Sequence, residues 1–154
     1  METDLSQIFS IATTQCLDST ITSMKQALER VSTLVSKQTD ALSEQAILHA
    51  IRKREKLGST LLGNGIALPH GRLDDLAHPV GAILTLEAPI RVTDSEQQGI
   101  DIVIALFVET NASNEHLNLL ATLVKHLQKK DVIQKIRMAN DKETLFKALT
   151  VGTI

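Results

Sequence analysis

The sequence predicts a single α/β domain, a sandwich in which a mixed β-sheet of about five strands is flanked by helices on both faces. One observation is residues 100–108, IDIVIALFV, an almost continuously apolar run that is typical of a central strand buried on both sides. A second is the order of patterns along the chain, in which helical stripes come first, strand-like runs follow, and helical stripes return. Since a strand buried on both sides needs cover on both, helices are expected above and below the sheet.

Two helices are predicted before the strands. Residues 21–37 carry apolar side chains at helical spacing, with Lys and Glu on the other side. Ser43 can cap the next helix, and Gly58 is a plausible stop signal for it. The basic run at residues 52–56 suits the carboxyl end of that helix, where the helix dipole favours cations.

The remaining elements follow from short apolar runs. Residues 66–68 and 80–86 are predicted to be strands that join the central one. Residues 111–114 form a turn-like loop rich in capping residues, and a helix is expected after it. A short helix is predicted over residues 131–139, and a last helix is expected after Asp141, which can cap it.

Composition excludes several classes of protein. The chain has 154 residues, of which 43% are hydrophobic and 22% charged, and this fits one globular domain, 1–154. A net charge of −2 and 2% aromatic residues argue against a nucleic-acid-binding surface. The sequence lacks an apolar run of about 18 residues and a secretory signal, and Cys16 is its only cysteine. We therefore expect a cytoplasmic protein without membrane insertion.

The least ordinary stretch is residues 58–72, GSTLLGNGIALPHGR, which contains four of the seven glycines. Because proline fixes its own φ angle and lacks an N–H group, Pro69 is predicted to end the strand before it. His70 would then sit just beyond a strand end, where Gly71 leaves its surroundings open to a partner and Arg72 supplies a cation.

This arrangement suits a phosphoryl acceptor. A neutral imidazole is nucleophilic near pH 7, since its ordinary pKa is about 6.5. Phosphoryl transfer chiefly requires positioning and stabilised oxygens, which backbone N–H groups near Gly71 and a guanidinium can provide. On spacing alone, a simple Pro-His-Gly turn without chemistry is an equally good interpretation.

A family resemblance favours the chemical interpretation. Residues 54–72, REKLGSTLLGNGIALPHGR, resemble the phosphorylation-site motif of enzyme IIA domains of the fructose/mannitol class, which belong to the bacterial phosphoenolpyruvate-dependent phosphotransferase system. The order of elements matches over about residues 5–150. The form of the motif is most similar to that of the nitrogen-regulatory IIA proteins (IIA-Ntr, PtsN-like), although residues 61–62 are two leucines where those relatives often have a smaller pair.

The resemblance implies a role for three residues. His70 matches the phosphorylated histidine, with the phosphoryl group on Nε2. His116 matches the second active-site histidine, which would contact the phosphoryl oxygens or orient His70. Arg54 matches the arginine of the family's Arg-Glu pair, which would neutralise charge as the phosphoryl group arrives. The alternatives from the residues alone are a surface histidine at a helix start and an exposed arginine at a helix end.

Further support for the phosphoryl group is expected from four residues around the motif: Gly71, Arg72, Thr60 and Asn64. Arg72 would grip an acidic partner or be solvated. Thr60 and Asn64 would give hydrogen bonds to the site or only shape the turn. His49, His78 and His126 have no support from a motif, and no cofactor or metal site is expected.

A geometric expectation follows for the two histidines. If the strand before His70 runs parallel to the central strand, the carboxyl ends of both share one edge of the sheet, where ligand sites of α/β proteins form. The helix that carries His116 begins at that edge. Their ring nitrogens should then lie within roughly 6–7 Å of each other, so that one phosphoryl group touches both, with Arg54 bordering the same depression.

The function that the resemblance implies is a phosphotransferase in the sense of a phosphohistidine carrier. It would accept a phosphoryl group from a histidine-phosphorylatable carrier protein (HPr- or NPr-like) and act as a phosphorylation-dependent regulator through protein–protein contacts. One alternative is a sugar-transport shuttle that passes the group to a IIB cysteine. An alternative of another class is a non-catalytic regulatory binding module.

Overall fold

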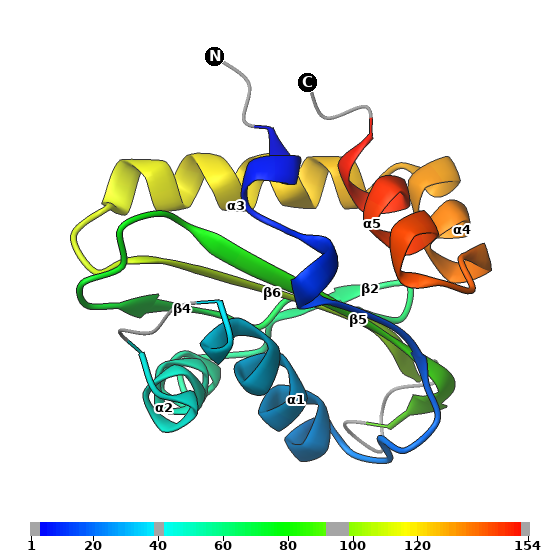
Figure 1. Cartoon of the computed structure of the whole chain (residues 1–154), viewed down its shortest axis with the longest axis horizontal. Coiled ribbons are helices and arrows are strands. Elements are labelled where there is room, and N and C mark those ends of the chain that lie inside the picture. Colours follow the sequence, from blue (N-terminus) through cyan, green and yellow to red (C-terminus); the bar gives the residue numbers. More distant parts are fainter. Residues whose placement is uncertain (1–3, 39–41, 92–98, 152–154) are drawn as a thin grey trace.

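The computed structural model describes residues 4–38, 42–91 and 99–151. Among these residues, six strands form one mixed sheet with helices on both faces, so the predicted fold class is confirmed with one strand more than expected (Figure 1). The strands are β1 (Thr14–Asp18), β2 (Leu61–Gly63), β3 (Ile66–Ala67), β4 (His70–Leu73), β5 (Val80–Ile90) and β6 (Ile100–Glu109). The helices are the 3₁₀ turns η1 (Leu5–Gln7) and η2 (Ile11–Thr13) and the α-helices α1 (Met24–Ser36), α2 (Glu44–Glu55), α3 (Ser113–Leu127), α4 (Lys130–Met138) and α5 (Lys142–Thr150).

The central strand is β6, as its apolar sequence predicts. The strand order is β1-β5-β6-β3-β2, and β4 pairs with the last part of β6 beyond β3. β3 and β4 both run parallel to β6, whereas β5 runs antiparallel to it. Alternate side chains of β6 enter two separate cores, because neighbouring residues of a strand point to opposite faces. Ile104 and Leu106 belong to one core, and Ala105 and Phe107 belong to the other.

Each face has its own helical layer. α1 and α2 cover the face to which Phe107 points, through buried residues such as Val31 and Ile51. α3, α4 and α5 cover the opposite face, through residues such as Leu123 and Leu145 (Figure 1). The caps predicted for two helices are confirmed, since Ser43 accepts a hydrogen bond from the Ala46 amide and Asp141 accepts one from the Thr144 amide.

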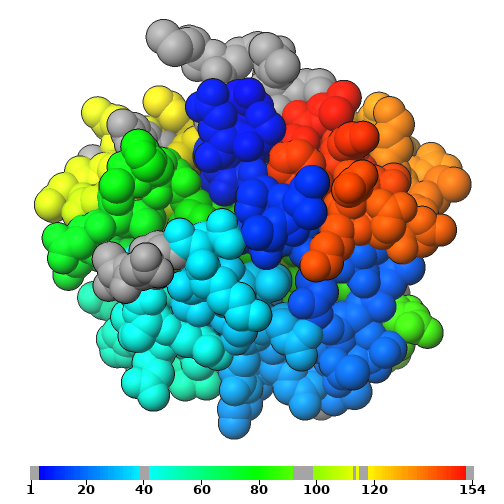
Figure 2. Space-filling view, in the orientation of Figure 1, coloured from blue at the N-terminus to red at the C-terminus, as the bar shows by residue number. Residues whose placement is uncertain are grey.

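The N-terminal segment closes one side of the sandwich. Figure 2 shows it, in blue, between the green segment that leads into β5 and the red α5. The Ile8 carbonyl accepts a hydrogen bond from the Gly81 amide at 2.9 Å. The Phe9 ring lies where a Cβ on Gly81 would be, with its nearest atom 2.4 Å from that position. Glycine at this position of β5 is therefore what admits the aromatic ring to the core.

Within the described ranges, no helix is long and apolar enough to cross a lipid bilayer.

Candidate functional site

His70 lies at a break between two short strands that share one partner. β3 ends at Ala67, and β4 begins at His70, beside Leu106 of β6. Between them the Pro69 carbonyl accepts a hydrogen bond from the Leu106 amide at 3.1 Å. The prediction that the strand ends before the histidine is therefore correct, but the chain resumes pairing at once, because β6 extends beyond β3 and offers further partners.

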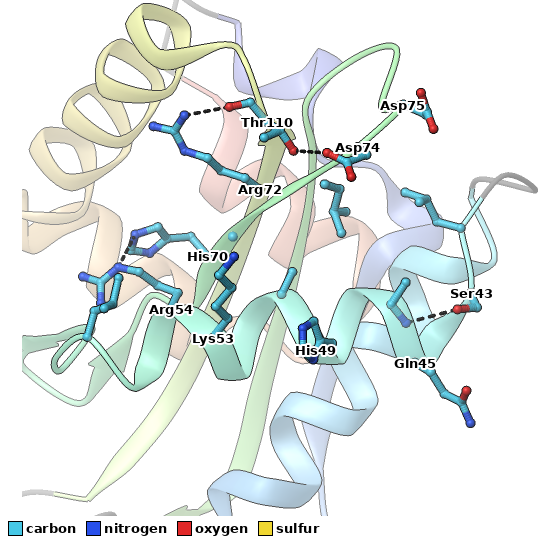
Figure 3. A pocket seen from close by; sticks show the side chains of 16 residues that line it. Ser43, Gln45, His49, Lys53, Arg54, His70, Arg72, Asp74, Asp75 and Thr110 are labelled. Carbon is cyan, nitrogen blue, oxygen red and sulfur yellow. Dashed lines mark hydrogen bonds between the residues drawn. The ribbon is translucent and has the colours of Figure 1, made fainter.

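Both ring nitrogens of His70 are engaged. Nδ1 lies 2.9 Å from the Leu68 carbonyl oxygen. Nε2 lies 3.1 Å from Nε of Arg54, the contact drawn in Figure 3. A carbonyl oxygen only accepts, so Nδ1 carries the proton, and a guanidinium only donates, so Nε2 presents its lone pair. The contacts thus select the neutral tautomer whose nucleophilic nitrogen is Nε2.

The surroundings of His70 keep the ring neutral near pH 7. Burial lowers the pKa of His70 most, the hydrogen bond to Leu68 opposes this, and the charge of Arg54 lowers the pKa further against the opposite effect of Glu55. The net result is a pKa below the ordinary value. A half-buried imidazole with a lowered pKa is unprotonated at Nε2, which is the state that a phosphoryl acceptor requires.

Arg54 reaches His70 from the carboxyl end of α2. Basic residues fill the last turn of this helix and complement its dipole. Nη1 of Arg54 donates to the Gly58 carbonyl at 3.1 Å, while Nε is directed at His70. The structure therefore brings the predicted pair together, with the guanidinium held by the turn after its own helix.

Gly71 does not open the site, contrary to the expectation from the sequence. It is buried against α2, and a Cβ at this position would lie 3.1 Å from the Ala50 carbonyl oxygen. Its side of β4 is therefore closed by a helix and unavailable to a partner. The missing side chain permits α2 to approach β4 closely, which is what places Arg54 beside His70.

Arg72 is exposed on β4 and is tied to the end of β6. Its Nη1 donates to the Thr110 carbonyl at 2.8 Å, and the Thr110 hydroxyl donates to Asp74 at 2.6 Å (Figure 3). The guanidinium lies on the same strand as His70, two residues away, so it contributes a cation to this side of the sheet.

Thr60 and Asn64 flank β2 on opposite ends. The buried Thr60 hydroxyl donates to Glu55 Oε1 at 2.6 Å, so it reaches the site through the neighbour of Arg54. Asn64 forms the turn between β2 and β3 with a φ angle of 55°, and its carbonyl accepts a hydrogen bond from Arg137. β3 begins beside Ile102, far along β6 from the partner of His70, so Asn64 is not brought to the site.

The second predicted histidine lies partly outside the described residues. The backbone of His116 is in the first turn of α3, but its side chain is not described, so the expected distance between the two rings stays a prediction. The premise of that prediction is confirmed, since β3 and β4 run parallel to β6 and α3 begins soon after β6 ends.

Beside His70 runs a groove of about 1060 Å³ between α2 and β4. Lys53, Arg54 and Arg72 give the end near His70 a positive character, whereas Asp74 and Asp75 line it farther along (Figure 3). Among the residues that the structure describes, no cluster of three or more His, Cys, Asp or Glu side chains could hold a metal ion.

Glu55 is a contributor to which the motif assigned no role of its own. Glu55 directly follows Arg54, receives the Thr60 hydroxyl and acts on the pKa of His70. The available signal was its position beside Arg54 in the motif, but an acidic residue in a basic helix end is easily assigned to solvent.

Comparisons with known proteins show the family of this chain. The model of the family described as "Phosphoenolpyruvate-dependent sugar phosphotransferase system, EIIA 2" matches residues 7–151. The "Nitrogen regulatory protein" of Escherichia coli K12 is 37% identical over 147 residues, which cover 94% of this chain and 90% of the relative.

Solved structures show the same fold. The crystal structure of nitrogen regulatory protein IIA-Ntr from Neisseria meningitidis superposes with a TM-score of 0.85 at 27% identity, covering 95% of this chain and 99% of that one. The IIA mannitol structure from Escherichia coli gives a TM-score of 0.74 at 20% identity, over 91% of this chain and 97% of that one.

Proposed function

Because the chain belongs to the EIIA 2 family of the phosphoenolpyruvate-dependent sugar phosphotransferase system, we propose that it accepts a phosphoryl group on Nε2 of His70 from a phosphohistidine of a small carrier protein (HPr- or NPr-like). The observation that carries the proposal is the pair of contacts on the ring, which leaves the lone pair on Nε2 and directs that nitrogen at a guanidinium. The phosphorylated form then regulates other proteins by contact.

The transfer step balances with the groups present. The lone pair of Nε2 attacks phosphorus, the phosphorus–nitrogen bond of the carrier's phosphohistidine breaks, and its electron pair returns to the carrier's ring. No proton need leave His70 during this step, because Nδ1 keeps its hydrogen. The positive charge that develops on the ring is stabilised by the Leu68 carbonyl, which already accepts that hydrogen at 2.9 Å.

Arg54 has two tasks in this mechanism. Before transfer its Nε–H occupies Nε2, so the guanidinium must turn aside to admit phosphorus. Its anchor on the Gly58 carbonyl keeps the group beside the site during that turn, where the N–H donors face the incoming oxygens. His116, placed by its backbone in the first turn of α3, is proposed to bind the same oxygens.

Regulation follows from charge. A phosphoryl group adds about −1.5 to −2 charges, which offsets the cations of Lys53, Arg54 and Arg72 and changes what can dock in the groove. Similarity to nitrogen regulatory proteins along almost the whole chain favours regulation over sugar transport. The alternatives are a shuttle to a IIB cysteine and a module that binds without accepting phosphate. The proposal keeps the cytoplasmic location expected from the sequence.

The test is phosphorylation with purified components. The protein is incubated with phosphoenolpyruvate, enzyme I and each carrier, and an acid-labile, base-stable phosphate is measured. We expect label on the wild type and on His78→Ala, a control for an exposed histidine, and none on His70→Ala with native-like circular dichroism. Full labelling of His70→Ala would transfer the role to another histidine, and rapid onward transfer to a IIB cysteine would favour the shuttle.

Two further variants test the supporting roles. Arg54→Ala and His116→Ala should slow transfer without preventing it, because neither residue forms the covalent bond. Loss of one charge-assisted contact in the transition state costs about 2–4 kcal/mol, or about 30- to 1,000-fold in rate. Unchanged single-turnover rates in both variants would leave the two side chains without a role in transfer.

A further inference from the structure

The turn after α2 is held mainly by polar contacts. Residues 56–59 are all exposed, and Leu57 retains 81% of its accessible surface. The turn is held by hydrogen bonds. The Leu57 amide donates to the Arg54 carbonyl, the Gly58 amide donates to the Glu55 carbonyl, and Nη1 of Arg54 donates to the Gly58 carbonyl. The Thr60 hydroxyl donates to the Glu55 carboxylate at 2.6 Å. With so little apolar burial, the last of these bonds has a large share in the position of the helix end.

Thr60 is where this turn meets the strand that carries His70. Its side chain is 7% exposed, so water competes little for the hydroxyl. Its carbonyl accepts a hydrogen bond from the Leu68 amide at 2.9 Å, and the Leu68 carbonyl in turn accepts from Nδ1 of His70.

These contacts form a closed loop that includes Thr60, Glu55, Arg54, His70 and Leu68. One arm runs from Thr60 through Glu55 to Arg54, its neighbour in sequence, and the other runs from Thr60 through Leu68 to His70. The loop of contacts closes where Nε of Arg54 lies 3.1 Å from Nε2 of His70. Arg54 and His70, the two partners of this contact, are therefore both connected to the buried Thr60.

We propose that Glu55, held by the Thr60 hydroxyl, is a positioning residue that keeps the end of α2, and with it Arg54, beside His70. The guanidinium that turns aside for phosphorus then still faces the incoming oxygens, which speeds phosphoryl uptake. This inference rests on the proposed function. Glu55 accepts the hydroxyl of Thr60 and acts on the site through its neighbour Arg54. A hydrogen bond to a carboxylate is stronger than one between neutral groups, which suits a bond that holds a turn with little apolar burial.

Variants of Thr60 test the proposal without changing any charge. Thr60→Val keeps the shape and removes the hydroxyl, whereas Thr60→Ser retains it. Glu55→Gln is a graded variant, because its amide oxygen can still accept the hydroxyl but the charge that strengthens the bond is lost. Glu55→Ala removes the acceptor at a half-buried position, so it provides a matching loss if Thr60→Val fails to fold.

Two readouts separate positioning from simple stability. The first is hydrogen exchange of the Arg54 Nε–H, followed by NMR together with the ¹⁵N shifts of the His70 ring. The second is the single-turnover rate at increasing carrier concentration, which separates the maximal rate from the half-saturating concentration. We expect Thr60→Val and Glu55→Ala to speed Nε–H exchange and to lower the maximal rate at least tenfold each, with half-saturation unchanged. Thr60→Ser should remain within about twofold of the wild type, and Glu55→Gln should lie between the wild type and Glu55→Ala.

The outcomes distinguish the two proposals. If folded Thr60→Val or Glu55→Ala shows wild-type exchange of the Arg54 Nε–H and a wild-type maximal rate, positioning by Glu55 is overturned. If the wild type takes no phosphate from any carrier, the proposed function fails. Faster exchange of the Arg54 Nε–H in the variants would still show that Glu55 and Thr60 position Arg54 in the unphosphorylated protein.

Discussion

Replacing Gly71 by alanine should push α2 away from β4 and so lengthen the contact between Arg54 and His70. The new Cβ would lie 3.1 Å from the Ala50 carbonyl oxygen and 3.2 Å from the Ala50 Cβ, whereas ordinary contacts begin at 3.4 Å. The separation between α2 and β4 must therefore grow by about 0.2–0.3 Å (3.4 − 3.2 and 3.4 − 3.1). Because Arg54 lies one turn farther along α2, its 3.1 Å contact with His70 should lengthen toward 3.4 Å. That exceeds the usual range of about 2.7–3.2 Å for an N–H donor.

The expected cost in stability is modest. Overpacking of this kind costs about 1–3 kcal/mol, and the reduced freedom of the unfolded chain returns about 0.4–1 kcal/mol, which leaves a net loss of about 1–2 kcal/mol. Urea unfolding followed by circular dichroism is the suitable assay, since the chain contains no Trp or Tyr for fluorescence. The same samples give the exchange rate of the Arg54 Nε–H, which should rise at least severalfold. They also give the single-turnover rate of phosphoryl transfer to His70, which should fall at least severalfold.

Gly81→Ala is the matched control. Its Cβ would come within 2.4 Å of the Phe9 ring, on the face of the sheet opposite α2. This variant should lose more stability than Gly71→Ala while the exchange of the Arg54 Nε–H stays unchanged. If Gly71→Ala retains wild-type stability and wild-type exchange, the close approach of α2 to β4 does not govern the contact between Arg54 and His70.

Two further predictions concern residues away from the site. His126 is buried and Nε2 donates to the Leu149 carbonyl at 2.7 Å, while burial, the largest effect, holds the pKa of His126 below its ordinary value. The stability that neutral His126 contributes is complete above about pH 6.5, its pKa in the unfolded chain. It is lost as the pH falls from that value toward the lower pKa of the folded state, by at most about 1.4 kcal/mol per pH unit. His126→Gln should therefore flatten the decline of the unfolding free energy between pH 7 and 5, and an unchanged slope would contradict this. Arg137 makes a two-point contact with Asp101, at 2.9 and 2.8 Å, and also binds the Asn64 carbonyl. Asp101→Asn should therefore cost about 1 kcal/mol in urea unfolding, less at high salt, with the rate of phosphoryl uptake unchanged; a slower uptake would show that this turn reaches the site.

The sequence predicted the elements whose signals are local. β6 was identified because continuous apolar character records burial on both faces. Ser43 and Asp141 were identified as caps because capping depends on a few consecutive residues. The strand β5 continues to Ile90, beyond the predicted end at residue 86, since pairing with β6 resumes there after an irregularity that no local pattern announces.

Short strands at the margins of the sheet could not be predicted in the same way. β1 and β4 contain few apolar residues, and each exists because a longer strand presents unpaired backbone groups beside it. In β4, only Gly71 and Leu73 are buried, and a glycine carries no apolar signal. The extra strand therefore depends on β6 extending past Pro69, which is a property of the tertiary structure.

The same distinction explains the site. The motif identified His70 and Arg54, but their contact depends on how closely α2 approaches β4, and that approach is limited by the absence of one side chain at Gly71. From the sequence, this glycine was predicted to leave an opening for a partner, because a glycine beside a reactive residue shows only that space is needed and not what fills it. Here the space is filled by the Ala50 backbone. The requirement for glycine in the motif can thus be understood as a packing constraint with a chemical consequence. A larger residue would leave the histidine and the arginine in the chain but move apart the two nitrogens whose contact selects the reactive tautomer.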